Sequence, residues 1–339
     1  MFRLIDANLN RLSEGLRLLE DVARFILNDA ALSSRLKALR HDLLSNTKSF
    51  QKTILSARDS EGDVTAFSTE SMSRSDANDV VTANARRVTE SLRVLEEFAK
   101  LPDIGLDPMK FKRARFAIYE IEKELSGKVS RRGKRIAGLY VIIDREALGR
   151  KDEIDACRQA IRGGANIIQL RDKLENKSRM LNSAMKLQEA CAPSGVPFIM
   201  NDSLDIALAS GADGLHLGQD DLPVSAARHL LPIDKLLGCS TTTVKEALKA
   251  EADGADYIAI GSIYPTKSKS DITVVGLGRL REIREAVSLP IVAIGGINAD
   301  NARTVINAGA DAIAVISAIL ENDDVERATR KIAERLEAR

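Results

Sequence analysis

Apolar residues in the first part of the chain recur every three to four positions, the spacing of one face of an α-helix. The charged residues Arg17, Glu20 and Arg24 lie to one side of this apolar stripe. Further amphipathic patterns follow, LKALRHDLL from Leu36 and FKRARFAIYEIEKEL from Phe111. The pattern predicts an all-α domain whose helices pack as a bundle. The first stripe consists of Leu9, Leu12, Leu16, Leu19, Ala23 and Ile26.

The helical part contains an internal repeat. The segment DANLNRLSEGLRLLEDVARF from Asp6 matches TANARRVTESLRVLEEFAKL from Thr82 at a constant offset. Each copy is followed by a further helical pattern, so the sequence predicts a duplicated helical hairpin. The residues that recur are Ala7, Asn8, Arg11, Glu14, Leu16, Arg17, Leu19, Glu20 and Ala23, which correspond to Ala83, Asn84, Arg87, Glu90, Leu92, Arg93, Leu95, Glu96 and Ala99.

Two polar segments punctuate the chain. Ser56 to Asp79 has no apolar period, and we interpret it as either a functional loop or a disordered one. The basic stretch KVSRRGKR from Lys128 to Arg135 is interpreted as a solvated linker rather than an anion-binding patch, because no aromatic residue accompanies its charges. We therefore expect a helical domain over residues 1–133 and a second domain over residues 134–339.

The second part repeats a different unit, a short apolar strand followed by a turn and an amphipathic helix. Eight such units predict an α/β fold with a closed (β/α)8 TIM barrel, because the strands are apolar on both faces. A doubly wound sheet is the alternative, but no Gly-rich phosphate turn follows the first strand. The expected strands are LYVIID from Leu139, NIIQL from Asn166, PFIMN from Pro197, DGLHL from Asp213, KLLGC from Lys235, YIAIG from Tyr257, PIVAIG from Pro290 and DAIAVIS from Asp311.

Composition narrows the classes of function. The formal net charge of +1 provides no overall attraction to nucleic acid or to an anionic membrane, so we expect neither as a partner. Three cysteines at wide spacing and the absence of an apolar leader or a long apolar run indicate a cytoplasmic protein. The sequence leaves the oligomeric state open, a homo-oligomer included.

Polar residues and glycines stand at nearly every predicted strand end, which is where the active site of such a barrel lies. Three of them are cations, Arg171 and Lys173 after the second strand and Lys269 after the sixth, and these suit a diphosphate. The carboxylates of Asp202 and Asp221 suit Mg²⁺, which prefers phosphate oxygens as its other ligands. The sequence therefore predicts a site for a diphosphate substrate and magnesium.

A second phosphate site is expected at the last two strands. Gly295 and Gly296 follow the seventh strand, and Ile316 and Ser317 end the eighth. This arrangement matches the phosphate-binding loops common in these barrels, where main-chain amides bind the anion. Two phosphate sites at one end of the barrel imply two phosphorylated small-molecule substrates.

At these residues the sequence resembles thiamin phosphate synthase. The segments QLRDK, ND, HLGQDD, GCS, GSIYPTKSK, AIGGI and AVIS occur in this order over residues 139–339. The resemblance implies the joining of 4-amino-2-methyl-5-hydroxymethylpyrimidine diphosphate to hydroxyethylthiazole phosphate, with Asp202 and Asp221 binding magnesium. It also implies no nucleophilic side chain. The pyrimidine diphosphate would be held by Gln169, Leu170, Arg171, Asp172, Lys173, Asn201, Ser240 and Lys269, and the thiazole phosphate by Thr266, Lys267, Ser268, Gly296, Ile316 and Ser317.

The helical part resembles an alternative type of hydroxymethylpyrimidine phosphate kinase that occurs fused to such synthases, above all in DANLNR and EGLRLLED. No G-x-x-x-x-G-K-[ST] loop is present, so a kinase of this type would hold ATP in another way. The competing interpretation is that the repeated arginines and glutamates form solvated pairs four residues apart on each helix.

Two other functions stay open from the residues alone. A thiazole tautomerase shares this barrel but would not need the diphosphate set of cations and carboxylates. A non-catalytic phosphate-ligand sensor could use the helical part for dimerisation. Among individual residues, we interpret His216 as a hydrogen-bonded structural histidine near the site, and Asp144 as either a site residue or a turn cap.

Overall fold

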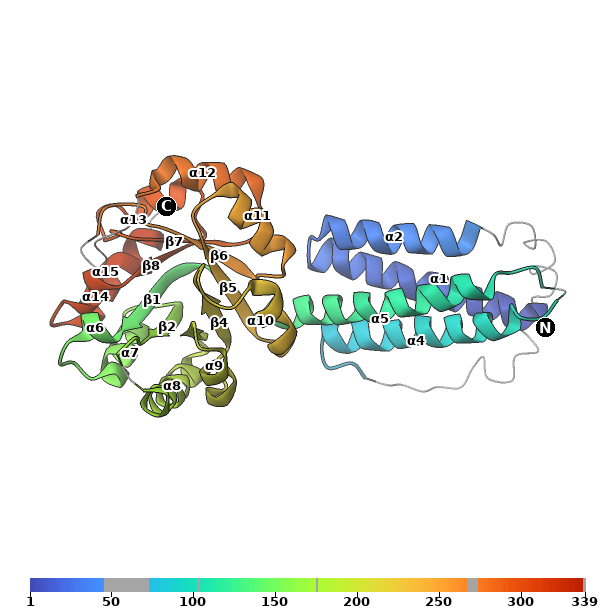
Figure 1. Ribbon diagram of the computed structural model, residues 1–339, viewed down its shortest axis with the longest axis horizontal. Helices are drawn as coiled ribbons and strands as arrows, with labels where there is room; N and C mark the ends of the chain where they lie inside the picture. Colours follow the sequence, from blue (N-terminus) through green and yellow to red (C-terminus); the bar gives the residue numbers. More distant parts are fainter. Residues whose placement is uncertain (46–72, 103, 175, 267–273, 338–339) are drawn as a thin grey trace. The chain divides into compact units, whose positions relative to one another are not determined.

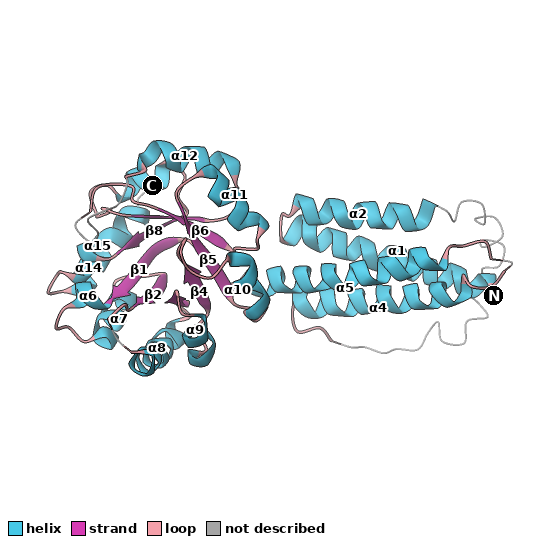
Figure 2. Cartoon of the chain, in the orientation of Figure 1, coloured by secondary structure: helices cyan, strands magenta, loops and turns pink. Residues whose placement is uncertain are grey.

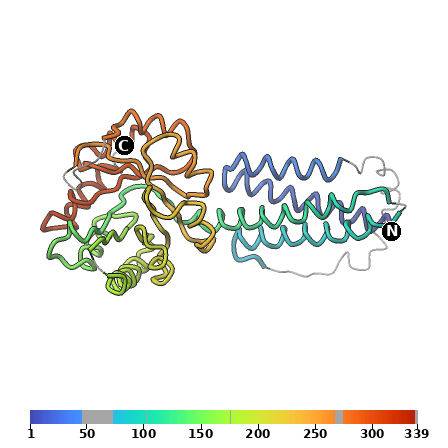
Figure 3. The backbone as a smooth tube through the Cα atoms, viewed as in Figure 1, coloured from blue at the N-terminus to red at the C-terminus, as the bar shows by residue number. Residues whose placement is uncertain are grey.

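The computed structural model describes residues 1–45, 73–102, 104–174, 176–266 and 274–337. The chain divides into two compact units, Met1–Gly133 and Lys134–Arg339. Figure 3 follows the backbone from the helices of the first unit into the alternating strands and helices of the second. Among the residues that the structure describes, no helix combines the length and apolar character needed to cross a membrane.

The first unit is a helical bundle, as the apolar spacing predicts (Figure 1). Helix α1 packs against both α2 and α4, and α4 packs against α5. Asp76 and Asp107 begin α4 and α5 by accepting hydrogen bonds from the main-chain amides of Asp79 and Met109. The elements are α1 (Phe2–Asp21), the π-helical turn η1 (Val22–Ile26), α2 (Ala30–Ser45), α4 (Ala77–Phe98) and α5 (Pro108–Arg131).

The sequence repeat is also a repeat of contacts. The Glu20 carboxylate accepts a hydrogen bond of 3.0 Å from Arg40 on α2. Its counterpart Glu96 accepts one of 3.0 Å from Arg115 on α5. In each copy the repeated glutamate thus joins the first helix of its hairpin to the second. Pairs within one helix also occur, since Arg93 contacts Glu96 at 3.0 Å and Glu97 at 2.9 Å, and Arg86 contacts Glu90 at 3.3 Å. The interpretation of solvated pairs within one helix therefore holds for part of α4 but does not account for the contacts of Glu20 and Glu96 with the neighbouring helices.

The second unit is a closed barrel of eight parallel strands in the order β1 to β8, and Figure 2 shows the helices around them. This confirms the predicted fold class and excludes the doubly wound sheet. The strands are β1 (Gly138–Asp144), β2 (Ile167–Arg171), β3 (Phe198–Asn201), β4 (Gly214–Leu217), β5 (Leu236–Thr241), β6 (Tyr257–Ile260), β7 (Ile291–Ile294) and β8 (Ala312–Val315). The helices are α6 (Arg145–Leu148), α7 (Glu153–Arg162), α8 (Lys177–Cys191), α9 (Leu204–Ser210), α10 (Val224–Leu230), α11 (Val244–Ala252), α12 (Gly276–Ala286), α13 (Ala302–Asn307), α14 (Ser317–Leu320) and α15 (Val325–Glu337), with a 3-10 turn η3 (Ala192–Ser194).

Alternate residues of each strand face opposite sides of the barrel wall. Leu139, Val141 and Leu170 belong to the core between the strands and the helices. Tyr140 and Tyr257 belong to a separate core inside the barrel, where both are almost fully buried. Gly238 of β5 is paired with Tyr257 of β6, and a Cβ at Gly238 would lie 2.1 Å from Cζ of Tyr257. This glycine therefore makes room for the tyrosine ring.

All three cysteines are buried thiols. Cys157 on α7 and Cys191 on α8 are distant in the sequence, but their Sγ atoms lie 3.8 Å apart in the core between strands and helices. The hydrogen bond with the Cys157 thiol, together with burial, raises the pKa of Cys191, so it stays protonated.

Candidate active site

The carboxyl ends of the first two strands supply an ion pair. Asp144 ends β1, Arg171 ends β2, and the strand register places the two residues opposite each other. A guanidinium N–H of Arg171 donates to the buried carboxylate of Asp144. Asp144 also accepts hydrogen bonds from the amides of Glu146 and Ala147 at the start of α6. The cap interpretation of Asp144 is therefore confirmed, and the same carboxylate holds Arg171, a cation predicted for the site.

The two carboxylates expected to bind magnesium lie together. The side chain of Asp221, after β4, is close enough to that of Asp202, after β3, to affect its ionisation. Lys173 lies beside them, with its Nζ 3.6 Å from Oδ2 of Asp202. Burial, together with the neighbouring Asp221 carboxylate, raises the pKa of Asp202 to about 6, although Lys173 opposes the shift. Asp220, by contrast, is exposed.

The main chain holds this pair in place. Asp202 has φ of 62°, a left-handed conformation that is uncommon for residues other than glycine. Its amide donates to the main-chain oxygen of His216 at 2.8 Å. The amide of Gly218 donates to Oδ2 of Asp221 at 2.7 Å. Uncommon backbone conformations held by their surroundings also occur at functional sites, which is compatible with the predicted role of Asp202.

The carboxylate pair suits a magnesium ion. Two carboxylates that share one site repel when both are ionised, and a divalent cation between them removes that repulsion. No group of three or more His, Cys, Asp or Glu side chains is arranged for a metal in the described ranges. Magnesium does not require such a group, because it commonly takes one or two carboxylates and completes its shell with substrate phosphates and water.

A chain of hydrogen bonds crosses the barrel interior beneath the site. The Nε2 amide of Gln169 donates to Oδ1 of Asn201 at 2.9 Å, and its Oε1 accepts from the Tyr140 hydroxyl at 2.7 Å. The hydroxyls of Tyr140 and Tyr257 lie 3.1 Å apart. On the far side, the His216 ring joins the Tyr257 hydroxyl at 3.1 Å.

The chain ends at Ser240, whose Oγ lies 3.0 Å from Nε2 of His216. It therefore connects Asn201 on β3 with Ser240 on β5, two residues predicted to bind the pyrimidine. Burial lowers the pKa of His216 to about 4, against the opposing charge of Asp221. Burial also raises the pKa of both Tyr140 and Tyr257. At neutral pH this network consequently carries no charge.

The expected thiazole phosphate residues lie at the ends of the last strands. Gly295 and Gly296 follow β7 with φ of 102° and 64°. A Cβ at Gly296 would lie 2.6 Å from the main-chain oxygen of Pro265, so glycine is needed for this close approach. Ile316 follows β8, Ser317 begins α14, and both are half-buried. Thr266 is described and half-buried, whereas Lys267, Ser268 and Lys269 lie outside the described residues.

Two of the predicted site residues have side chains that do not face the end of the barrel. Leu170 is fully buried in the core between strands and helices, so only its main chain is available to a ligand. Asp172 is also buried, and its Oδ1 accepts a hydrogen bond of 2.9 Å from the amide of Leu174. Its side chain shapes the turn after β2. Side chains alternate between the two faces of a strand, so Leu170 and Asp172 are expected to point away from the face that Gln169 and Arg171 share.

Sequence reasoning did not find Tyr140 and Tyr257. Tyr140 stands inside the apolar strand β1 and Tyr257 begins the apolar strand β6, and an aromatic residue at such a position ordinarily contributes to packing. The sequence does show which way Tyr140 points. It lies on the same face of β1 as Ile142 and Asp144, which follow it by two and four residues. A buried tyrosine hydroxyl needs a hydrogen-bond partner, so two inward tyrosines indicate a polar network.

Comparison with known proteins follows the same division of the chain. The family model for thiamine monophosphate synthase matches residues 139–319. The model for the ThiD2 family matches residues 3–124. A thiamine-phosphate synthase of Thermosynechococcus vestitus is 39% identical over 337 residues, which cover 98% of this chain and 94% of the relative.

Other relatives match the barrel alone. A thiamine-phosphate synthase of Methanocella arvoryzae is 51% identical over 196 residues, covering 57% of this chain and 92% of the relative. The solved structure of a thiamine phosphate pyrophosphorylase from Pyrococcus furiosus is 41% identical, with a TM-score of 0.55, and covers 59% of this chain and 96% of that protein. The barrel unit of this chain thus corresponds to nearly the full length of both relatives.

Proposed function

The chain belongs to the thiamine monophosphate synthase family, and on that premise we propose that its barrel joins 4-amino-2-methyl-5-hydroxymethylpyrimidine diphosphate to hydroxyethylthiazole phosphate. The products are thiamin phosphate and pyrophosphate. The observation that carries this proposal is the carboxylate pair Asp202 and Asp221 beside Lys173, in the loops after β2, β3 and β4. A tautomerase acting on a thiazole phosphate alone has no use for this set.

The diphosphate binds to the cations and the carboxylate pair. Arg171, oriented by Asp144, directs its remaining N–H groups to the phosphate oxygens, and Lys173 adds a second positive charge. Asp202 and Asp221 would hold Mg²⁺, which would supply positive charge to stabilise the departing pyrophosphate. Lys269 is proposed as a further diphosphate ligand from the sequence alone.

The network beneath the site orients the pyrimidine. Because Gln169 occupies the Oδ1 atom of Asn201, that side chain presents its NH2 group as a donor. The Ser240 hydroxyl is held by Nε2 of His216 and has capacity for a further hydrogen bond to the ligand. The carbon–oxygen bond to the pyrophosphate breaks, and the electron-rich pyrimidine stabilises the resulting methylene cation. The thiazole nitrogen then donates its lone pair to form the new carbon–nitrogen bond.

The second substrate occupies the loops after β6, β7 and β8. The main chain of Gly296, Ile316 and Ser317 supplies amides for the thiazole phosphate, with hydroxyl and amide contacts from Thr266, Lys267 and Ser268. The conformations of Gly295 and Gly296 support this assignment, since bare glycine turns allow an anion to approach the backbone.

The direct test combines the purified chain with both phosphorylated substrates and magnesium. Formation of thiamin phosphate and pyrophosphate is expected, and omission of magnesium should abolish it. A folded chain that releases no thiamin phosphate with magnesium present would favour a phosphate-ligand sensor instead.

For the helical unit we propose a hydroxymethylpyrimidine phosphate kinase activity. The match of residues 3–124 to the ThiD2 family supports it, together with the resemblance of the repeated segments. The reaction would transfer the γ-phosphoryl group of ATP to the phosphate of hydroxymethylpyrimidine phosphate, giving the diphosphate and ADP. Its product would be the substrate of the barrel. The test is to supply the full chain with hydroxymethylpyrimidine phosphate and magnesium, with and without ATP, and to look for the diphosphate.

The buried state of all three cysteine thiols fits the cytoplasmic location expected from the sequence, because a reducing compartment keeps thiols unpaired. The proposed partners are the two phosphorylated small molecules, with no role for nucleic acid or a membrane. A homo-oligomer stays compatible with this function.

A further inference from the structure

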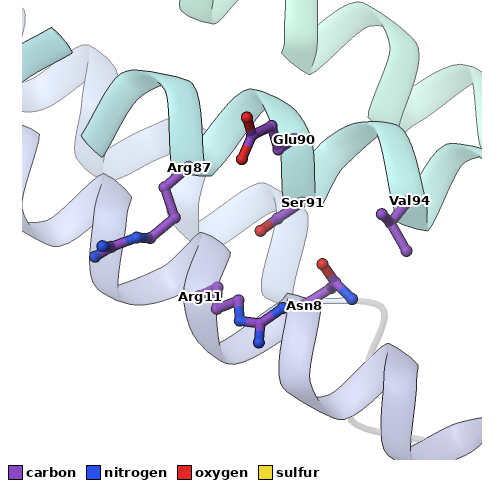
Figure 4. Close-up of a pocket in the computed structure, with 6 residues that line it drawn as sticks. All are labelled: Asn8, Arg11, Arg87, Glu90, Ser91 and Val94. Carbon is purple, nitrogen blue, oxygen red and sulfur yellow. The ribbon is translucent and has the colours of Figure 1, made fainter. Parts of the chain in front are cut away.

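A pocket of about 370 Å³ lies between α1 and α4 of the helical unit. Figure 4 shows Asn8 and Arg11 on α1, facing a row of side chains on α4. The row consists of Arg87, Glu90, Ser91 and Val94. A pocket of this size accommodates a small molecule with a single ring and a charged group.

The two copies of the repeat contribute equivalent residues to this pocket. Arg11 of the first copy corresponds to Arg87 of the second, and both line it. The helices cross closely here, since a Cβ at Gly15 would lie 2.6 Å from Cγ2 of Val88. Because α1 and α4 run in opposite directions (Figure 1), both arginines lie along the line of contact between the two helices, here called the seam.

The pocket arginines are not used to hold the bundle together. In the described part of the chain, neither Arg11 nor Arg87 has a hydrogen bond or ion pair with a protein group, and both are exposed. The repeated glutamates Glu20 and Glu96, by contrast, are held by arginines of the neighbouring helices. The repeat therefore contains two kinds of charged residue. The equivalent glutamates Glu20 and Glu96 join helices, whereas the equivalent arginines Arg11 and Arg87 have free N–H donors at the pocket.

The polar groups around the arginines favour a phosphate ester. Each guanidinium can bind an anionic oxygen pair with two parallel N–H groups. Ser91 is buried and directed at the seam in Figure 4, where its hydroxyl can donate to the same anion. The Nδ2 of Asn8 already donates to the main-chain oxygen of Leu4 at 2.9 Å, so its Oδ1 is the atom available to a ring N–H. The Glu90 carboxylate pairs with Arg86 at 3.3 Å, which reduces its repulsion of an anion.

We propose that this pocket binds the phosphate of a small phosphomonoester, with Arg11 and Arg87 as the paired anion ligands. The inference rests on the proposed kinase function, from which the ligand is hydroxymethylpyrimidine phosphate. Val94 then contacts the ring of that substrate, and the anion lies between the two guanidinium groups. The phosphates of ATP are also anions that two arginines can bind, so the test measures ATP binding separately.

The test uses the full chain and the double variant Arg11→Ala/Arg87→Ala. The matched control is Arg113→Ala, which removes an arginine of the same unit that is 71% exposed and does not line the pocket. Equilibrium dialysis measures the Kd for labelled hydroxymethylpyrimidine phosphate and, separately, for ATP. Helix content and the synthesis of thiamin phosphate from preformed diphosphate report whether each variant is folded and its barrel intact.

We expect the double variant to weaken binding of hydroxymethylpyrimidine phosphate at least roughly tenfold, while Arg113→Ala leaves it unchanged. Synthesis from preformed diphosphate should keep its wild-type rate in both. Loss of ATP binding alone would overturn the assignment of the monoester, and unchanged Kd values in the folded double variant would overturn the site. A wild-type chain that does not bind the monoester at all would overturn it as well.

The kinase assay separates this inference from the function on which it rests. If wild-type chain forms diphosphate and the double variant does so equally well, the kinase function stands and the pocket assignment fails. If the monoester binds through Arg11 and Arg87 but no diphosphate forms with ATP, the pocket stands as a binding site and the kinase function fails.

Discussion

Arg171 and Asp144 face each other at the ends of adjacent strands and form an ion pair in which the carboxylate is almost fully buried. Lys173, two residues further along, is 60% exposed on its side chain and reaches only to within 3.6 Å of Asp202. The two cations are therefore alike in their proposed role towards the diphosphate and different in what they do for the fold.

This difference predicts that Arg171→Ala weakens both activity and stability, whereas Lys173→Ala weakens activity alone. Removal of Arg171 leaves a buried carboxylate without its partner and should lower the free energy of unfolding of the barrel by about 2–4 kcal/mol. Lys173→Ala should change it by less than about 0.5 kcal/mol. Urea unfolding and the KM for the pyrimidine diphosphate measure the two effects. Adding Asp144→Asn to Arg171→Ala should recover part of the lost stability, and no recovery would argue against the pairing.

Asp202→Asn is expected to separate function from stability. Asparagine tolerates the left-handed conformation at φ of 62°, so the change removes the charge without adding backbone strain. Magnesium-dependent synthesis of thiamin phosphate should fall at least roughly tenfold. The exposed neighbour offers the matched variant Asp220→Asn, which should retain full turnover.

The raised pKa of Asp202 also fixes the sign of a pH effect. Its pKa is about 6 in the folded chain and close to 3.9 when unfolded. Ionising this carboxyl in the folded barrel without magnesium is unfavourable. The free energy of unfolding of the wild-type barrel should therefore fall as pH rises from about 4 to about 6, and it should remain at the lower value above pH 6. Asp202→Asn should remove that loss and stabilise the metal-free barrel at pH 8 by about 1 kcal/mol. Equal stability of both proteins at pH 8 would contradict this.

His216 should produce a pH effect of the opposite sense. Its pKa of about 4 in the fold lies below the value near 6.5 in an unfolded chain. The unfolded chain therefore takes up a proton first, and stability should fall as pH drops from about 6.5 towards 4, by roughly 2–3 kcal/mol. His216→Gln should flatten this part of the stability profile. A profile as steep as that of wild type would place the titration on another group.

Tyr257→Phe should interrupt the buried chain at its centre. The hydroxyl contacts both Tyr140 and His216, so its removal leaves a buried ring nitrogen without its partner and should lower the free energy of unfolding by about 1–3 kcal/mol. Because the network orients Asn201 and Ser240, the KM for the pyrimidine diphosphate should rise while that for the thiazole phosphate stays constant. Tyr119→Phe in the helical unit removes an exposed hydroxyl and serves as the control. Equal changes in both KM values would contradict a role specific to the pyrimidine.

Gly296→Ala should act on the other substrate. The added Cβ would lie 2.6 Å from the oxygen of Pro265 at a φ of 64°, so the turn must shift. We expect the KM for the thiazole phosphate to rise at least roughly tenfold. Gly149→Ala is the matched control, because its φ is 60° and a Cβ there meets nothing within 4 Å. It should reduce stability by about 1 kcal/mol and leave both KM values unchanged.

The architecture could be predicted from the sequence because its signals are local. Short apolar strands separated by amphipathic helices gave all eight strands of the barrel, and strand ends gave the carboxylate pair that the structure brings together. The side-chain direction within the segment QLRDK was missed, so Leu170 and Asp172 were included with the residues that face the site. Alternation along β2 would have shown that the side chain of Leu170 faces the helices, which leaves its main chain as the part available to a ligand.

Other features depend on pairing between distant segments. The contact of Asp144 with Arg171 and the meeting of Tyr140 with Tyr257 follow from the register of the closed barrel, which no single segment specifies. In the helical unit the repeat was evident, but the arginines Arg40 and Arg115 that join Glu20 and Glu96 to neighbouring helices lie outside the repeated segments. The proximity of Cys157 and Cys191 is of the same kind.

The uncharged chain from Asn201 to Ser240 has a consequence for the reaction proposed above it. A reactive carbocation is destroyed by any water or anion that reaches it before the intended acceptor. Here the floor beneath the ring is made of an imidazole, two phenols and an amide whose polar atoms are already engaged with one another. These groups offer the carbocation neither an unengaged lone pair nor a counter-ion. Its premature capture from this side is therefore disfavoured, and the thiazole nitrogen has no competing nucleophile there.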